Sequence, residues 1–233
     1  MAGAGRRRVP LWETVRSGDP EWAHQFLARE YAEHRVELLG NAAGFEFSHR
    51  LVRGDDRFSI ARIGYSLAVL ASVDLVAAVL VVQVHRGRLS VRAGERDDFG
   101  PGELFVYPPG RPVSVSCDQF RLTVVRFEPH PLARYAASIV TADSSGLGVT
   151  PLAAGRSSGP DWRSLFVGRR PVSAGMARYW RATVRHVLTE VLADPELAED
   201  PVVLDAAYRQ LAAAALATFA PTPTPTPSPA PRR

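Results

Sequence analysis

Few side chains in this sequence have the type and spacing needed for chemistry. His85 follows an apolar run and could orient a ligand, although a histidine at a strand end is more often simply hydrogen-bonded or solvated. Asp97 and Asp98 could act as paired carboxylates, but between two nearby glycines they are more typical of a solvated hairpin turn. Neither group favours catalysis over an ordinary structural role.

Cys117 is the only cysteine and could act as a nucleophile. It alternates with Val113 and Val115 as a small buried hydrophobe would, and no histidine adjoins it. The sequence also contains no Ser–His–Asp elbow, no phosphate-cradling glycine loop and no zinc-ligand spacing. We therefore predict no catalytic residue.

The stretch from Leu80 to Cys117 indicates which elements position these side chains. Apolar and polar residues alternate over 88–92 and again over 113–117, which is typical of strands with one buried face. Glycine and proline clusters separate the two segments at short, regular spacing. This pattern predicts short strands in a sandwich or barrel.

The same stretch resembles the cupin double-stranded β-helix. Gly102, Pro108 and Gly110 reproduce the frame of the second cupin motif, and Gly87 fits the closing glycine of the first. The resemblance places the four metal-ligand slots at Val113, Leu80, and either Asp74 with Val76 or Val73 with Leu75. Zinc, iron or manganese needs converging imidazole and carboxylate donors, so we predict a cupin without a metal or other cofactor.

Composition limits the class of protein. The chain has 233 residues, of which 46% are hydrophobic, enough for one globular core with helical additions. All 28 basic residues are arginine, which fits the amino-acid usage of a GC-rich genome, so a pI near 9.7 is weak evidence for a nucleic-acid partner. The single cysteine suits a reducing cytoplasm, where we expect the protein.

The N-terminus does not predict a signal peptide, and residues 67–84 do not predict a membrane span. Three arginines open the chain, but Val9-Pro10-Leu11-Trp12-Glu13 follows them, which is not the apolar region of a signal peptide. Residues 67–84 are almost wholly apolar, but the run is short, rich in valine and carries Asp74. Strands buried on both faces give the same pattern, and we expect strands here.

Further elements follow from spacing and caps. Asp19-Pro20-Glu21 can begin a first helix. Strands are expected over 35–39, 45–51, 58–65, 67–73, 76–84 and 120–124. After residue 131 the pattern becomes helical, and we expect helices over 132–140, 176–192 and 202–219. We predict a mainly β fold with α, a cupin-like barrel followed by two or three C-terminal helices.

This order of elements resembles the N-terminal effector-binding and dimerisation domain of AraC-type transcription regulators. The resemblance lies in DPEWAHQFLAREYAEHRVELLG, VHRGRLSVRAGERDDFGPGELFVYPPGRPVSV and DAAYRQLAAAALATF, and spans about residues 12–219. It implies a barrel with its entry helix over 12–131 and a helical dimerisation region over 132–219. We expect disordered segments at 1–11 and at 220–233, where the sequence is rich in proline. Such regulators continue into two helix-turn-helix units, whereas here only 13 residues follow Ala220. We therefore expect no direct nucleic-acid binding by this chain.

In cupins the metal-ligand positions point into the barrel, and this predicts which alternate residues of each strand face the interior. Even-numbered residues from Val76 to Val84 and odd-numbered residues from Val113 to Cys117 should point inward, giving an apolar interior that is either packed core or a pocket. A pocket would take an apolar or aromatic effector, with polar contacts from strand-end residues. The candidate ligand-binding residues are Arg62, Tyr65, Leu80, Val82, Val84, Tyr107, Val113, Val115 and Arg126.

The last helix carries an apolar stripe of Leu204, Leu211, Leu216 and Phe219, with alanines between. Either the stripe packs on the barrel of its own chain or a two-fold partner covers it, and we predict a homodimer through these residues. The leading hypothesis is a non-enzymatic effector-sensing domain with no membrane contact. The alternatives are a metal-free cupin isomerase or lyase, and a truncated or frameshifted regulator gene product.

Overall fold

A computed structural model of the chain describes residues 12–108, 110–145, 162–166 and 168–219. The segments predicted to be disordered, 1–11 and 220–233, lie outside these residues.

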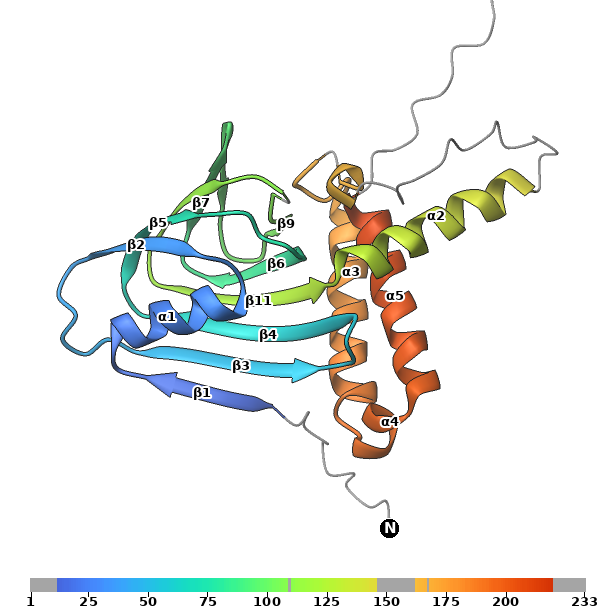
Figure 1. The fold of residues 1–233 in the computed structure, drawn as a ribbon, viewed down its shortest axis with the longest axis horizontal. Coiled ribbons are helices and arrows are strands. Elements are labelled where there is room, and N and C mark those ends of the chain that lie inside the picture. The colour runs from blue at the N-terminus through green and yellow to red at the C-terminus, as the bar shows by residue number, and fades with distance from the viewer. Residues whose placement is uncertain (1–11, 109, 146–161, 167, 220–233) are drawn as a thin grey trace, which may run out of the picture.

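Two antiparallel sheets face each other and form the predicted barrel (Figure 1). The first sheet has the order β1-β3-β4-β11-β6-β9, and the second has the order β2-β5-β10-β7-β8. The strands of the first sheet are β1 (Glu13–Ser17), β3 (Phe47–Arg53), β4 (Phe58–Tyr65), β6 (Val79–Arg86), β9 (Leu104–Val106) and β11 (Phe120–Phe127). Those of the second are β2 (His34–Leu39), β5 (Ala68–Val73), β7 (Leu89–Ala93), β8 (Glu95–Phe99) and β10 (Val113–Cys117).

The first helix, α1 (Pro20–Glu30), begins as its sequence predicts. Asp19 caps it, because one carboxylate oxygen accepts hydrogen bonds from the backbone N–H groups of Glu21 and Trp22 at 2.9 and 3.3 Å. The helix then packs on β3, with the Phe26 ring 5.8 Å from that of Phe47 and 5.0 Å from that of His49. In Figure 1 it lies across the barrel between β2 and β3.

Gly87 forms the tight turn between β6 and β7. Its φ of 85° lies in the left-handed region, and a side chain there would place its first carbon 2.0 Å from the carbonyl oxygen of Gln119. The glycine that matched the first cupin motif is therefore required both by backbone conformation and by the close approach of a neighbouring segment.

The helices after the barrel are α2 (Pro129–Ser145), α3 (Ala174–His186), α4 (Pro195–Glu199) and α5 (Pro201–Phe219). A single turn of 3₁₀ helix (Trp162–Ser164) precedes α3, and a π-helical turn (Val187–Val191) extends it. Helices α3 and α5 lie side by side at one end of the barrel (Figure 1). By length and composition α5 could cross a membrane, the one described helix for which this holds, but half of its most apolar window is buried inside the protein.

Two hydrophobic cores share the first sheet. Inward side chains such as Leu80, Val82 and Val124 form a barrel core. Val81 and Val125, one residue further along their strands, point the opposite way and join a helix core with α3 and α5. The period of two along each strand therefore sends alternate side chains into two separate cores.

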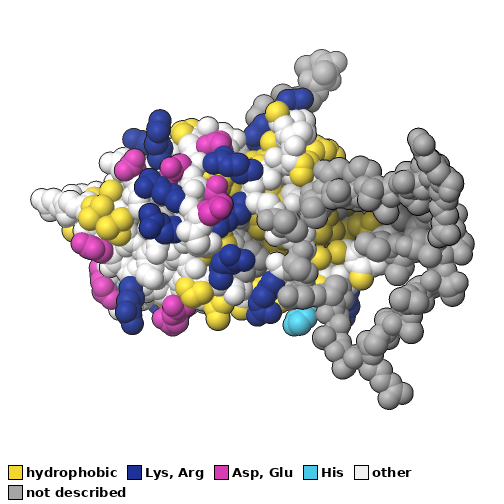
Figure 2. Space-filling view, turned by 90° about the horizontal axis from the view of Figure 1, so that it is seen from above, with side chains coloured by type: hydrophobic (Ala, Val, Ile, Leu, Met, Phe, Trp, Pro, Cys, Tyr) yellow, Lys and Arg dark blue, Asp and Glu magenta, His cyan; other side chains and the backbone are white. Residues whose placement is uncertain are grey.

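The structure corrects one expectation about the acidic pair and adds three strands. Asp97 and Asp98 lie on β8, not in a hairpin turn, and β1 and β9 were likewise not predicted. Asp97 accepts a hydrogen bond from the Arg169 guanidinium at 2.8 Å. Seen from above, basic and acidic side chains are interspersed over the barrel (Figure 2). Both members of the acidic pair are ion-paired, since Asp98 lies 3.1 Å from Nε of Arg96.

Candidate functional site

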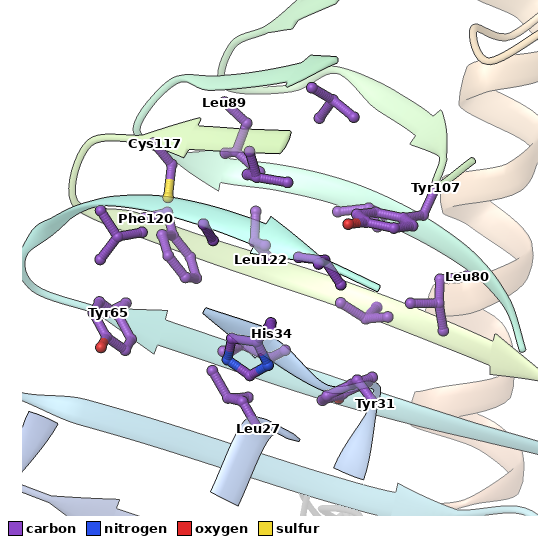
Figure 3. A pocket seen from close by; sticks show the side chains of 18 of the residues that line it. Leu27, Tyr31, His34, Tyr65, Leu80, Leu89, Tyr107, Cys117, Phe120 and Leu122 are labelled. Carbon is purple, nitrogen blue, oxygen red and sulfur yellow. The ribbon is translucent and has the colours of Figure 1, made fainter. Parts of the chain in front are cut away.

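The barrel encloses an apolar cavity of about 180 Å³. Its walls come from both sheets and from α1 (Figure 3). Ile63 and Leu122 line it from the first sheet, Val69 and Val91 from the second, and Leu27 from the helix. The alternation of the strands produces this lining, because every second residue of each strand is apolar and points inward. No Asp, Glu, Lys or Arg is among the described residues that line it.

Two histidines line the cavity where α1 meets β2. The Nδ1 atom of His34 lies 2.8 Å from the carbonyl oxygen of Ala32, so this nitrogen is the donor. In the neutral ring Nε2 of His34 is then an acceptor, and Nδ1 of His24 lies 3.0 Å from it. Burial is the main cause that lowers the pKa of His34, which favours this neutral form. The pair joins the helix to the second sheet.

A second polar contact joins α1 to the first sheet. The hydroxyl of Tyr31, at the end of the helix, is hydrogen-bonded to Nε2 of His49 on β3 at 3.0 Å. His49 is 1% exposed, and burial, with a smaller effect of the Arg53 charge, lowers its pKa to about 4. Both ends of the contact are therefore neutral near pH 7, and it holds the helix by hydrogen bonding without charge.

Tyr107 differs from these groups because its hydroxyl has no partner. The oxygen is buried, and the structure gives it no hydrogen bond. In Figure 3 the Tyr107 ring lies over the cavity with its oxygen directed into it. Burial raises the pKa of this hydroxyl well above its ordinary value, so it stays protonated.

The two remaining ionisable groups on the cavity wall are also neutral. Burial raises the pKa of the Cys117 thiol to about 12 and, as the largest cause, that of Tyr65 to about 12. A thiol with so high a pKa is a poor nucleophile at neutral pH because the thiolate is the reactive form. The cavity is therefore suited to holding an uncharged molecule.

Five of the nine predicted ligand-binding residues line the cavity: Tyr65, Leu80, Val82, Tyr107 and Val115. Val84 and Val113 are buried in the barrel core but do not line it. Two predicted residues lie elsewhere. Arg62 faces outward, with its guanidinium over the Trp12 ring at 5.1 Å, and Arg126 is ion-paired with Glu128 at 2.9 Å. Their placement corrects the prediction that these two strand residues reach an effector.

The prediction missed the wall that α1 and β2 supply, including His24, Leu27, Tyr31 and His34. The apolar face of the helix was visible in the sequence, and such a face must cover some other surface. The sequence did not indicate that this surface is the opening between two sheets.

The predicted dimer-interface residues lie inside the chain's own helix core. Leu204, Leu211 and Phe219 are 8%, 0% and 1% exposed, and Leu216 is half-buried against the same core. Helix α3 and the outer face of the first sheet cover this stripe within the chain, which is one of the two alternatives open from the sequence. A subunit interface through these residues stays a prediction.

The sequence predicts that the residues at the cupin metal-ligand positions do not bind a metal. In the described part of the chain, no three His, Cys, Asp or Glu residues come together as a metal site would require. His85, the remaining candidate from the sequence, is hydrogen-bonded through Nε2 to the Thr123 hydroxyl at 2.8 Å.

Comparison with known proteins identifies the family to which this chain belongs. Residues 23–217 match the family described as the AraC-binding-like domain, and the chain belongs to this family. A solved structure described as the AraC-like transcriptional activator CuxR is similar with a TM-score of 0.59 and 14% identity, covering 92% of this chain and 73% of that one. At this identity the similarity establishes the shared fold. A search of curated proteins finds no match.

Individual cupin domains match over smaller parts of the chain. The cupin domain of Schizosaccharomyces pombe Cnp3 is 12% identical, with a TM-score of 0.32, over 46% of this chain and 70% of that one. The cupin domain of an XRE family transcriptional regulator from Enterobacter cloacae is 14% identical, with a TM-score of 0.30, over 42% and 98%. The fold is the predicted one, a cupin-like barrel followed by helices.

Proposed function

We propose that this chain is a non-enzymatic, small-molecule-sensing domain of the AraC-regulator type, and that its effector binds in the barrel cavity. The observation that carries the proposal is the cavity itself, which has a volume of about 180 Å³ and is lined mostly by apolar side chains. An engineered cavity of about 150 Å³ with a wholly apolar lining stays dry and binds benzene. The effector is accordingly a small apolar or aromatic molecule.

The protonation states of Cys117, Tyr107 and His34 support sensing over catalysis. A metal-free cupin enzyme needs an acid or base that exchanges a proton near neutral pH. Here Cys117 and Tyr107 have raised pKa values and His34 has a lowered one, so all three stay neutral around pH 7. None of them is poised to exchange a proton there.

The two cores give the effector a way to act on the helices. Val82 and Val124 line the cavity from adjacent strands, β6 and β11. Their neighbours Val81 and Val125 pack in the core that holds α3 and α5. A ligand that shifts these strands also shifts the surface on which the helices rest, because packed interiors transmit displacement.

Pairing of two copies and a cytoplasmic location complete the proposal, and we assign no nucleic-acid contact to residues 12–219. Pairing rests on the family, since the stripe first expected to form the interface is covered within the chain. Exposed apolar side chains remain on the last two helices, with Leu197 38% and Val202 77% exposed. Light scattering across a concentration series measures whether two copies associate.

A matched pair of variants on β10 tests ligand binding. Val115 lines the cavity, whereas the adjacent Ser114 is exposed. Val115→Phe should fill the cavity and abolish the thermal stabilisation given by toluene and related uncharged aromatic compounds, while Ser114→Phe should leave it unchanged. The proposal fails if no such compound stabilises the wild-type protein, or if Val115→Phe binds as the wild type does.

A further inference from the structure

The Tyr107 hydroxyl lines the cavity, is buried, and has no hydrogen-bond partner among the described residues. We infer that this hydroxyl is the specificity determinant of the site, and that it binds the single uncharged hydroxyl or carbonyl group of an otherwise apolar effector. The inference rests on the proposed function and adds the chemical class of the ligand.

An unpartnered hydroxyl in an apolar cavity is unfavourable, since the group has lost its hydrogen bonds to water and gained none. Tyr107 belongs to the segment after β9, and its backbone N–H donates to the carbonyl oxygen of Leu80 at 2.9 Å. The ring is thus held against β6 with its oxygen directed into the cavity (Figure 3). A ligand that accepts or donates one hydrogen bond there removes the penalty.

Three of the other polar side chains at the cavity wall already have hydrogen-bond partners. His24 is hydrogen-bonded to His34, and Tyr31 to His49. A ligand with several hydroxyl groups would therefore leave most of them without partners, which disfavours sugars. A charged ligand would lose its hydration without meeting an opposite charge, because no Asp, Glu, Lys or Arg lines the cavity.

The cavity volume sets the size of the ligand. At about 180 Å³ it is slightly larger than an engineered cavity of about 150 Å³ that accommodates benzene. A molecule with one ring, or a branched aliphatic molecule of the same size, fits this space. Phenols, aryl alcohols, small cyclic ketones and similar compounds meet both the size and the polarity of the site.

A control for the hydroxyl exists within the same protein. Tyr208 on α5 also has a buried hydroxyl without a recorded partner, but it belongs to the helix core and does not line the cavity. Tyr107→Phe and Tyr208→Phe therefore remove the same atom from two buried positions, and only the first faces the proposed ligand.

Phenol and toluene are suitable probes because they have nearly the same shape and differ in one hydroxyl group. Binding of both to wild type, Tyr107→Phe and Tyr208→Phe is measured by calorimetry. We expect wild type and Tyr208→Phe to prefer phenol by roughly threefold to tenfold, the equivalent of one net hydrogen bond. Tyr107→Phe should lose this preference and bind toluene at least as tightly as the wild type does.

The possible results separate the two proposals. Equal preference for phenol in wild type and Tyr107→Phe overturns the role of Tyr107 but leaves the cavity as a ligand site. Binding of neither probe overturns both. The unliganded proteins give a second readout, because Tyr107→Phe should resist denaturant as well as or better than the wild type. A clear loss of stability in Tyr107→Phe would show that the hydroxyl has a partner and would contradict the inference.

Discussion

Val124 and Val125 are adjacent on β11, yet their side chains belong to different cores. Val124 lines the cavity inside the barrel, and Val125 packs with the helices outside it. Both are almost fully buried, at 4% and 1% exposure. The difference between them is therefore one of surroundings, because Val124 faces partly empty space and Val125 faces close-packed side chains.

This contrast predicts unequal effects of the same substitution. Val125→Ala should lower the free energy of unfolding by about 2 kcal/mol, since it opens a new void in a packed core. Val124→Ala should cost less, because part of that side chain already borders a cavity and makes fewer contacts. Urea unfolding of both variants measures the difference. Equal losses would indicate that the barrel interior is as tightly packed as the helix core.

Leu211 is expected to be essential to the folded chain itself. It has no exposed surface and lies in the middle of α5, facing the helix core. Leu211→Ala should lower the free energy of unfolding by about 2–5 kcal/mol, and the loss should not depend on protein concentration. Val202→Ala, at an exposed position on the same helix, is the control and should have little effect. A loss that appears only at low concentration would restore Leu211 to a subunit interface.

The stability of the fold should decrease in mild acid because of His49. Its pKa in the folded protein is about 4, below the ordinary value of 6.5, so the unfolded chain takes up a proton at a higher pH than the folded one. Stability is therefore full above pH 6.5 and falls as the pH drops towards 4, by on the order of 2–3 kcal/mol. The lowered pKa of His34 acts in the same direction. Chemical denaturation at a series of pH values measures the decrease.

The control for this prediction is His49→Gln, which keeps a side chain able to hydrogen-bond Tyr31 but cannot titrate. The variant should lose less stability than the wild type between pH 7 and pH 5. An identical decrease in both proteins would assign the acid sensitivity to other groups.

Cys117 is expected to be chemically inert in the native protein. Burial raises the pKa of its thiol from 9.0 to about 12, so almost no thiolate exists at pH 8. A thiol-reactive dye should label the folded protein very slowly and should label one thiol per chain once denaturant is added. Rapid labelling without denaturant would contradict both the burial and the assigned role of Cys117 as part of an apolar wall.

The barrel was predictable in part because some inner strands have one polar face. Around Val115 a shift of one residue would expose an apolar set, so the alternation determined which way that side chain points. Around Val82 both faces are apolar, and the cupin resemblance supplied the inward direction there. The same parity argument would have placed Arg62 outward, since it lies between the inward Ala61 and Ile63 on β4. Parity does not account for Arg126, which shares the inward parity of Leu122 and Val124 but is ion-paired with Glu128.

Other features depend on contacts between distant segments, which local patterns do not contain. The stripe on α5 predicted that Leu211 is buried, but not whether its own barrel or a second copy covers it. Strand β9 has only three residues and gives almost no periodic signal. The unpaired hydroxyl of Tyr107 is likewise a property of the assembled cavity, since the sequence shows a tyrosine but not its missing partner.

The place of α1 in the cavity wall has a kinetic consequence. Leu27 and Tyr31 border the space a ligand would occupy, and the helix is held by Tyr31 to β3 and by His24 to β2. A ligand that enters by displacing this helix must break both hydrogen bonds. For that route the observed association rate would level off with increasing ligand concentration, at the rate at which the helix opens. Residence time would be governed by the same motion, so one helix would determine both how quickly the effector is detected and how long the signal lasts.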